Sequence, residues 1–250
     1  MSSSVNDIQD ALKQLRLAEA STELPHLLRQ AEKHSWTYME LLTQLTDYEL
    51  SQRESKSIQR RLNWAKFPYY KTLKEYHISE QTSLSQRQLI QLQDLNWVEQ
   101  QYNLIFLGPP GVGKTALSIG LGIEAIQRGY QVIFVAMGEL MYLLKTEEFT
   151  RKSQIQLNRL RAAQLVIIDD LMYMAMDQYE ANLFFQLINH LYEQSSIILT
   201  SNKAPDQWSD LMGDQGITTA ILDRLLHRVE VIQMDGESYR MKHKEKIFKS

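Results

Sequence analysis

The stretch Gly108-Pro109-Pro110-Gly111-Val112-Gly113-Lys114-Thr115 decides the fold, because it matches the phosphate-loop pattern G-x-x-x-x-G-K-[ST]. The apolar run 104–107 before it predicts a buried strand, and residues 116–126 after it have the apolar spacing of a helix. Between a strand and a helix, glycines let backbone N–H groups approach phosphate oxygens, and the helix N-terminus adds positive partial charge. The stretch is therefore predicted to bind a nucleotide rather than to form an ordinary Gly/Pro turn.

Two acids downstream complete a predicted magnesium site. The ammonium group of Lys114 supplies charge for the outer phosphates, and the hydroxyl of Thr115 is a candidate Mg²⁺ ligand. The apolar run 165–168 ends in Asp169 and Asp170. An acid at the end of a buried strand that follows a phosphate loop can hold Mg²⁺, so Asp169 is the predicted metal ligand. Asp170 is predicted to polarise the attacking water; the alternative is a pair of acids that merely end a strand in solvent.

Two later polar residues are weaker candidates. Asn202 ends the apolar strand 196–202, where its amide can hold the attacking water or the outer phosphate, although Asn is also a common turn former. Arg224 lies in a predicted helix over 217–227, and a guanidinium group can spread charge over transferring phosphate in cis or in trans. From spacing alone, a surface ion pair of Arg224 with Asp223 or a neighbouring acid is favoured.

Composition narrows the class of protein. The 250 residues carry a formal net charge of −3, so any nucleic-acid binding must come from local basic patches. The absence of cysteine excludes a disulfide scaffold, thiol catalysis and cysteine-ligated zinc. No apolar run approaches the length of a membrane span, and the N-terminus lacks a secretion signal. A cytoplasmic protein without membrane contact is expected.

Buried strands that alternate with helices predict the architecture. Right-handed crossovers between parallel strands place the ligand at their C-terminal ends. Residues 7–66 contain no glycine and read as helices, with Thr22 and either Ser35 or Thr37 as N-caps. The expected domains are 1–66 and 67–250, with a connector and a leading helix at 85–98 inside 67–100. Further strands are expected at 131–135, 165–170, 196–202, 229–232 and around Tyr239, and helices at 138–148, 154–163, 182–192, 205–212 and 217–227.

Two basic stretches are candidate DNA-binding surfaces. The first lies near the end of the helical N-terminal region, where aromatic residues are interleaved with the basic ones, and the second follows the strand at 131–135. Basic side chains can lie on a phosphate backbone, but a charge run is more often an exposed helix face. The candidates are Arg53, Lys56, Arg60 and Arg61 in the first stretch, and Lys145, Arg151, Lys152 and Arg159 in the second.

Together these motifs resemble the IstB family, ATP-binding helper proteins of insertion-sequence transposition close to the DnaC/DnaI helicase loaders of the AAA+ class. The resemblance covers nearly the whole chain. It implies a P-loop AAA+ α/β fold with a parallel five-stranded sheet flanked by helices, and a small all-helical N-terminal domain for assembly and DNA contact. Besides the phosphate loop and the Asp169-Asp170 strand, it is carried by residues 66–73, 181–188, 198–202, 220–227 and 236–240.

The resemblance also implies roles for individual residues. Residues 108–115 would be Walker A, Asp169 and Asp170 Walker B, and Asn202 sensor 1, with ATP and Mg²⁺ as cofactors. Arg224 would be the arginine finger that reaches a neighbour's ATP, and Arg240 the sensor-2-type arginine. Lys145 to Arg159 would fall where this clade carries a DNA-contacting helical insertion. Asp170 stands where AAA+ proteins usually have Glu, so slow hydrolysis is expected.

The implied function is an ATPase that assembles as a homo-oligomer on double-stranded DNA and presents that DNA to a cognate transposase. The nearest alternative is a helicase loader of the DnaC/DnaI type. An alternative of another class is a P-loop phosphotransferase, although no segment resembles a small-substrate lid. A nucleotide-binding switch with negligible turnover also stays open, because Asp170 is shorter than the usual Glu.

Overall fold

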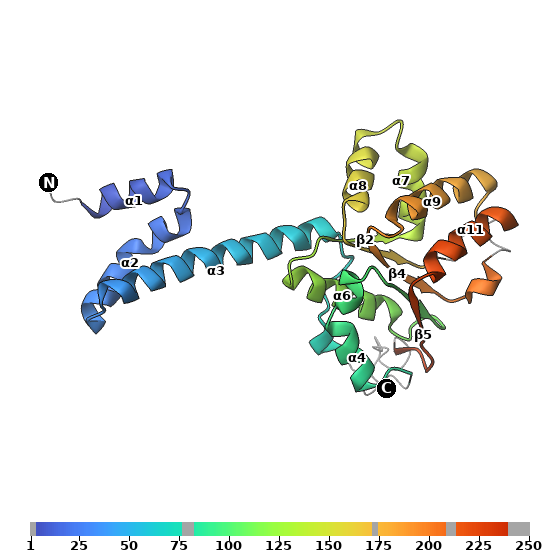
Figure 1. The fold of residues 1–250 in the computed structure, drawn as a ribbon, viewed down its shortest axis with the longest axis horizontal. Coiled ribbons are helices and arrows are strands. Elements are labelled where there is room, and N and C mark those ends of the chain that lie inside the picture. The colour runs from blue at the N-terminus through green and yellow to red at the C-terminus, as the bar shows by residue number, and fades with distance from the viewer. Residues whose placement is uncertain (1–3, 77–82, 172–174, 209–213, 240–250) are drawn as a thin grey trace, which may run out of the picture. The chain divides into compact units, whose positions relative to one another are not determined.

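The structure is a computed structural model that describes residues 4–76, 83–171, 175–208 and 214–239 (Figure 1). By its internal contacts the chain divides into two compact units, residues 1–60 and 61–250. Helix α3 (Tyr38–Ala65) contributes to both units, so the predicted domain division between residues 66 and 67 stays a prediction. Among the described residues, no helix combines the length and the apolar character that crossing a membrane requires.

The N-terminal unit contains α1 (Val5–Gln14), α2 (Ala18–His34) and most of α3. Thr37 caps α3 as predicted, because its Oγ1 accepts a hydrogen bond from Glu40 N at 3.2 Å. The predicted cap at Thr22 is wrong. Helix α2 begins four residues earlier, at Ala18, and the Thr22 hydroxyl donates to the Ala18 carbonyl within the helix at 3.0 Å.

Polar contacts join the three helices of this unit. Pro25 lies inside α2 and has no N–H to offer to the carbonyl of Ser21. The Gln9 side chain of α1 donates to that carbonyl instead, at 2.7 Å. From α3, the buried carboxylate of Glu49 accepts a hydrogen bond from Ala20 N at 2.8 Å. These bonds fix α1 and α3 against α2, which supplies the buried apolar side chains Ala20, Leu24 and Leu27.

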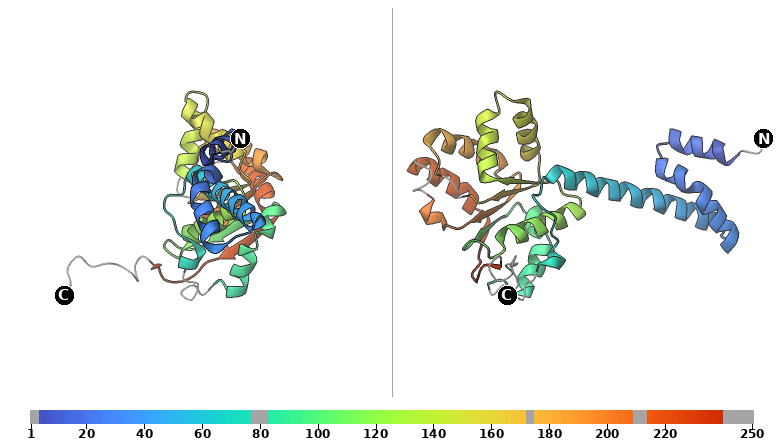
Figure 2. Two further views of the ribbon diagram at one scale, coloured as in Figure 1. Left: turned by 90° about the vertical axis from the view of Figure 1, so that its left-hand side faces the viewer. Right: turned by 180° about the vertical axis from the view of Figure 1, so that it is seen from behind.

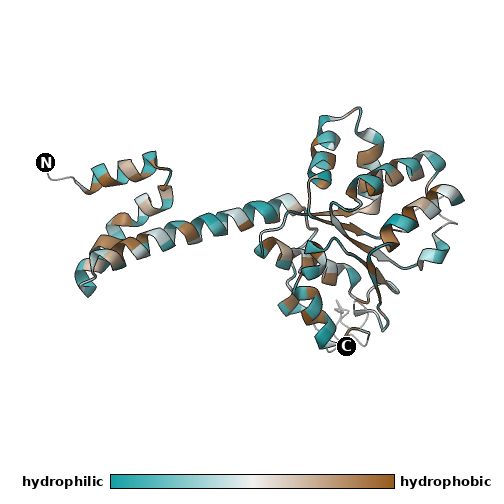
Figure 3. Cartoon of the chain, viewed as in Figure 1, coloured by the Kyte–Doolittle hydropathy of each residue, from teal (hydrophilic) through white to brown (hydrophobic). Residues whose placement is uncertain are grey.

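The second unit is built on a parallel five-stranded sheet, which confirms the predicted fold class (Figure 1). The strand order β2-β3-β4-β1-β5 is non-sequential, so helical crossovers connect the strands. The residues of β1, β3 and β4 are all buried, and the strands are strongly apolar (Figure 3). The strands are β1 (Asn103–Leu107), β2 (Val132–Ala136), β3 (Leu165–Asp169), β4 (Ser196–Ser201) and β5 (Val229–Gln233).

Helices cover both faces of this sheet, as the views from the front and from behind show (Figures 1 and 2). One face packs on α6 (Lys114–Gln127), which contacts β2, β3 and β4 and is itself contacted by α4 (Gln86–Gln93). The opposite face shares its apolar core with the remaining large helices. These are α7 (Met137–Thr146), α8 (Arg151–Arg161), α9 (Gln178–Leu191) and α11 (Gln215–Leu226).

Two sequence-based element predictions need correction, and a third is described only in part. The helix expected over 85–98 is interrupted at Leu95, whose positive φ of 56° ends α4 before the short α5 (Asn96–Glu99) begins. The strand expected around Tyr239 is absent from the described residues, where 234–238 form no regular strand. Of the helix expected over 205–212, the structure describes a 3-10 turn at Pro205–Gln207, and residues 209–213 lie outside the described residues.

Candidate nucleotide-binding site

The phosphate loop connects β1 to α6, as its sequence context predicts. Gly113 adopts a positive φ of 99° at the N-cap, and α6 begins at Lys114. Gly111 also has a positive φ, of 87°. Such backbone conformations strain residues with a Cβ, so the glycines allow the loop to fold back over the N-terminus of α6. The N-terminus of this 14-residue helix then adds positive partial charge to the space that the loop encloses.

Lys114 lies inside this loop with its side chain almost fully buried. Its Nζ donates to the Gly108 carbonyl at 2.7 Å and to the Pro109 carbonyl at 3.0 Å. A buried ammonium group needs such acceptors, because its desolvation is costly. The loop therefore holds a positive charge at its centre, which is where phosphate oxygens are attracted.

Thr115 and Asp169 meet at the floor of the site, although 54 positions separate them in sequence. The Thr115 hydroxyl donates to both carboxylate oxygens of Asp169, at 2.9 and 3.0 Å. Asp169 is the last residue of β3, and Thr115 is in the first turn of α6, which packs on β3. The structure thus brings together the two residues predicted to hold Mg²⁺.

The environment of Asp169 suits a cation. Burial raises the pKa of its carboxyl above the ordinary value, against the opposing effect of the hydrogen bonds from Thr200 and Thr115. A divalent cation would favour the charged carboxylate. Oxygen ligands suit Mg²⁺, which usually keeps several waters and takes phosphate oxygens as ligands. The hydroxyl of Thr115 and the carboxylate of Asp169 fit that pattern, and the described residues contain no cluster of three or more acidic or histidine side chains that would form an all-protein cage.

Asp170 and Asn202 lie at the same edge of the sheet. Asp170 directly follows β3 and adopts a positive φ of 56°, with its side chain exposed. Asn202 directly follows β4, the neighbour of β3, and is also exposed. Because parallel strands end at one edge, both side chains are placed on the side of the sheet where the phosphate loop begins. Their predicted roles stay predictions.

Thr200 is a residue of this site that the sequence analysis did not assign. It is completely buried in β4, and its hydroxyl donates to Asp169 Oδ1 at 2.6 Å. The oxygen of the Thr200 hydroxyl also accepts a hydrogen bond from Asp170 N at 2.9 Å. A signal was present in the sequence, because Thr200 is a polar residue within a buried strand and lies two positions before Asn202, on the same strand face.

A segment near the end of the described chain, residues 234–239, borders the phosphate loop. Met234 N donates to Leu107 O at 2.7 Å, and Tyr239 N donates to Gly111 O at 3.0 Å. A Cβ on Gly111 would lie 2.2 Å from the Ser238 hydroxyl oxygen. A side chain at Gly111 would therefore also displace Ser238 from its place beside the loop. Arg240, the predicted sensor-2-type residue, lies outside the described residues.

Arg224 is held by its own chain on the α9–α11 side of the unit. Its Nε donates to Asn189 Oδ1 at 3.0 Å, and its guanidinium carbon lies 4.9 Å from the centre of the Phe185 ring. A third contact joins Nη1 to the Ala220 carbonyl at 2.8 Å. None of these contacts, among the described residues, involves the phosphate loop. The structure therefore does not bring Arg224 together with Lys114 and Asp169 within one chain.

The predicted DNA-binding residues differ in their surroundings. Arg53 donates to Glu49, Lys56 donates to Glu19, and Lys145 donates to Glu180 at 2.8 Å.

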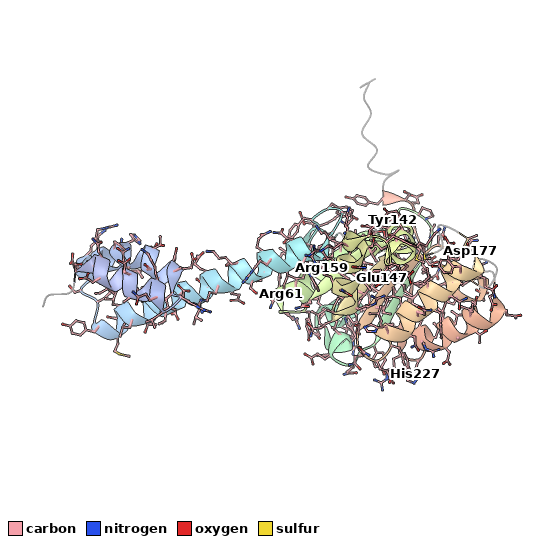
Figure 4. All side chains as sticks on the ribbon, turned by 90° about the horizontal axis from the view of Figure 1, so that it is seen from above. Arg61, Tyr142, Glu147, Arg159, Asp177 and His227 are labelled. Atoms are coloured by element: carbon pink, nitrogen blue, oxygen red, sulfur yellow. The ribbon has the colours of Figure 1, made fainter. Side chains whose placement is uncertain are left out.

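Arg151 and Lys152 are exposed at the start of α8 and make no ion pair with a described residue. Arg159, in the last turn of α8, is half-buried and likewise makes no ion pair with a described residue; it lies on the α7–α8 side of the unit, away from His227 at the end of α11 (Figure 4). Arg60 donates to the Lys56 carbonyl within α3, and Arg61 is half-buried.

The parallel sheet, the loop after β1 and the acid that ends β3 define the class as a P-loop domain of the AAA+ type. The chain belongs to the family of IstB-like ATP-binding proteins, whose model matches residues 10–247, so the family predicted from the motifs is confirmed. A relative from Pseudomonas aeruginosa, named as an ATP-binding protein of insertion sequence IS21, is 38% identical over 97% of this chain and 91% of its own length. A relative from Geobacillus stearothermophilus, named for insertion sequence IS5376, is 37% identical over 86% of this chain and 85% of its own length.

Solved structures share the fold at low sequence identity. A structure of DnaI superposes with a TM-score of 0.56 and 18% identity, covering 66% of this chain and 91% of that chain. A structure of AMPPCP-bound DnaA from Aquifex aeolicus gives a TM-score of 0.54 and 20% identity, and the match covers 71% of this chain and 54% of that chain. At these identities the likeness establishes the AAA+ fold alone.

Proposed function

We propose that this protein is an ATPase that binds ATP with Mg²⁺, assembles into a homo-oligomer on double-stranded DNA, and presents that DNA to a transposase encoded by the same insertion sequence. The observation that carries the ATPase part is the contact between Thr115 and Asp169 beside the buried Lys114. The names of the relatives, which describe ATP-binding proteins of insertion sequences, support the transposition part.

Each residue of the site has a distinct task in this proposal. Lys114 and the loop N–H groups bind the outer phosphates, and Thr115 with Asp169 holds Mg²⁺, which when bound neutralises charge that develops on the transferring phosphate. Asp170 and Asn202 orient and polarise the attacking water. The Asp170 side chain is one methylene shorter than Glu, so turnover is expected to be slow.

Arg224 is proposed to complete the site of a neighbouring subunit. Its contacts with Asn189 and Phe185 hold the guanidinium at the α9–α11 side of its own unit. An arginine supplied in trans stabilises transition-state charge on phosphate and makes turnover depend on assembly. Arg240 is proposed to contact the nucleotide of its own subunit; it directly follows Tyr239, whose N–H donates to Gly111 O in the phosphate loop.

Binding of double-stranded DNA is proposed to depend on α8. Arg151, Lys152 and Arg159 carry positive charge on this helix without a competing carboxylate among the described residues. Such charges neutralise phosphates and release counterions. The protein then needs no net positive charge, which agrees with its formal net charge of −3.

A two-part experiment tests this function. Binding of a fluorescent ATP analogue is measured for the wild type, for Lys114→Ala and for Lys145→Ala, whose lysine pairs with Glu180 outside the loop. Lys114→Ala is expected to lose nucleotide binding, and Lys145→Ala to retain it. Equal affinity in all three proteins would contradict the phosphate-loop assignment.

The second part uses electron microscopy and transposition assays. With ATP, Mg²⁺ and duplex DNA, the wild type is expected to form oligomers on the DNA and to stimulate the transposase encoded beside it. Oligomers that form without DNA and bind a ring helicase instead would favour the helicase-loader alternative. A protein that stays monomeric with ATP and phosphorylates a small molecule would favour the phosphotransferase alternative.

A further inference from the structure

The hydroxyl group of Thr200 is bonded to both acids at the end of β3. It donates its single hydrogen to Asp169 Oδ1 at 2.6 Å, and its oxygen accepts the backbone N–H of Asp170 at 2.9 Å. The side chain is completely buried, so water does not compete for either bond. The distances are those of good hydrogen bonds, and the bond to a charged carboxylate is the stronger kind.

The backbone after β3 depends on Thr200 at two consecutive positions. Asp170 N is bonded to the Thr200 hydroxyl, and Leu171 N donates to the Thr200 carbonyl at 2.9 Å. Asp170 has a positive φ of 56°, a conformation that costs most residues with a Cβ about 1–2 kcal/mol and that Asp adopts more readily than most. Such a conformation persists when neighbouring bonds determine it, and here one of those bonds comes from the Thr200 side chain.

Both oxygens of Asp169 also accept hydrogen bonds from Thr115. A cation held by Thr115 and Asp169 would displace these two bonds, because a hydroxyl that binds a cation points its hydrogen away from it. The bond from Thr200 to Oδ1 would remain available beside such a cation. Thr200 can therefore orient the carboxylate with and without metal, as bonded residues behind metal ligands commonly do.

We propose that Thr200 is a positioning residue that couples the two acids, because one hydroxyl orients Asp169 for metal binding and at the same time fixes the backbone turn that aims Asp170. This inference rests on the proposed ATPase function. It assigns to Thr200 no contact with nucleotide; the hydroxyl acts through Asp169 and Asp170.

Thr200→Val tests the assignment, because valine keeps the shape of threonine and removes the hydroxyl. The full-length protein is assayed for binding of a fluorescent ATP analogue in EDTA and in Mg²⁺, and for ATP turnover across a Mg²⁺ titration. In EDTA, the variant is expected to bind the fluorescent ATP analogue with the same affinity as the wild type. Its half-saturating Mg²⁺ concentration should rise, and its turnover should fall, each by about 10–100-fold, the usual effect of removing a residue that orients metal ligands.

Two further variants separate the hydroxyl from packing. Thr200→Ser keeps the hydroxyl and is expected to stay close to the wild type, whereas Thr200→Ala is a second variant without it and should behave like Thr200→Val. Either hydroxyl-free variant, once shown to be folded by circular dichroism, suffices for the comparison. Wild-type Mg²⁺ dependence in a folded hydroxyl-free variant would overturn the inference, as would a Thr200→Ser variant as impaired as Thr200→Val.

The coupling to Asp170 has its own test at saturating Mg²⁺. If Thr200 acts through Asp170, adding Thr200→Val to Asp170→Asn lowers kcat by much less than Thr200→Val lowers it in the wild type. If the fold-decreases in kcat caused by Thr200→Val and Asp170→Asn simply multiply in the double variant, the coupling is overturned. A wild type that binds no ATP with Mg²⁺ would overturn the ATPase proposal itself. An active wild type with an unaffected Thr200→Val would overturn the role of Thr200 alone.

Discussion

The carbonyl oxygen of Met234 occupies the space beside Gly108: a Cβ built on Gly108 would lie 2.0 Å from it. Gly108 opens the phosphate loop, and Met234 directly follows β5, the strand next to β1. The contact is part of the same packing in which Met234 N donates to Leu107 O at 2.7 Å. The first glycine of the loop is therefore fixed by a neighbouring strand end as well as by any phosphate.

Gly108→Ala is accordingly expected to destabilise the protein in the absence of nucleotide. Gly129→Ala is the matched control, since Gly129 also has a positive φ, of 97°, but has no atom within 4 Å of a built Cβ. We expect Gly129→Ala to lower the free energy of unfolding by about 1–2 kcal/mol through backbone strain alone, and Gly108→Ala to lower it clearly more. Urea unfolding without nucleotide, followed by circular dichroism, measures both. Equal destabilisation would mean that Met234 can move away at little cost.

The arginine on α11 leads to a prediction about assembly. Arg224→Ala should leave ATP binding unchanged and reduce turnover by about 10³-fold or more, if it acts as an arginine finger. Arg228→Ala is the control, because that exposed arginine lies in the turn after α11, and among the described residues its side chain makes a weak contact with Gln100 O, at 3.4 Å. The measurement is steady-state hydrolysis with saturating DNA.

Mixing experiments decide whether Arg224 acts in trans. In a mixture, an Asp169→Asn subunit keeps its Arg224 and an Arg224→Ala subunit keeps its metal site. Where the two are neighbours, the intact arginine can reach the intact site, so partial activity should return. Asn189→Ala should lower turnover without lowering ATP affinity, because Asn189 holds the Arg224 Nε at 3.0 Å. Activity that stays absent at every mixing ratio would speak against a shared site.

The parts of this site that the sequence predicted are those encoded by short continuous stretches. The phosphate loop sits between a strand and a helix because 104–126 carries the apolar pattern of both, and Asp169 ends a strand because four apolar residues precede it. The contact of Thr115 with Asp169 followed from parallel topology, since parallel strands end at one edge. The family, confirmed by the match over residues 10–247, was recognisable from the same stretches.

The features that the sequence did not predict depend on contacts between distant segments. Tyr239 was expected in a strand, but its N–H is bonded to the carbonyl of Gly111, a residue far away in the sequence, and no periodicity can reveal such a bond. Leu95 ends a helix that its apolar neighbours would continue, because its backbone adopts a positive φ that no local rule assigns to leucine. The surroundings of Arg224 likewise depend on how α9 packs against α11.

The basic residues of the α7–α8 region lead to a prediction about salt dependence. Lys152→Gln and Arg159→Gln should weaken duplex binding and reduce the slope of log K against log salt by about 0.9 for each DNA phosphate that is no longer neutralised. Lys145→Gln is the control, since Lys145 already pairs with Glu180 at 2.8 Å and has less charge to offer to DNA. Fluorescence anisotropy at several salt concentrations measures the slopes. A larger effect at Lys145 than at Lys152 would place the DNA elsewhere.

The ion pair of Glu147 with Arg161 leads to a prediction about pH. Both Arg161 Nη atoms donate to the Glu147 carboxylate, one of them at 2.8 Å, and this joins the end of α7 to the end of α8. The hydrogen bonds from Arg161 hold the pKa of Glu147 below its ordinary value, against the smaller opposing effect of burial. A carboxyl whose folded pKa is lowered contributes stability above its unfolded pKa of about 4.3, and loses it as the pH falls through the folded value.

Glu147→Gln is therefore expected to lower the free energy of unfolding at pH 7 by about 1 kcal/mol, a modest value because the pair is only partly buried. The difference from the wild type should shrink as the pH falls below about 4. Glu124→Gln is the control, since its pair with Arg128 is longer, at 3.9 Å, and more exposed, and it should cost little at any pH. Urea unfolding at pH 7, 5 and 3.5 gives the three curves. If the difference in unfolding free energy between Glu147→Gln and the wild type stays constant to the lowest pH, packing of Glu147, and not its charge, joins α7 to α8.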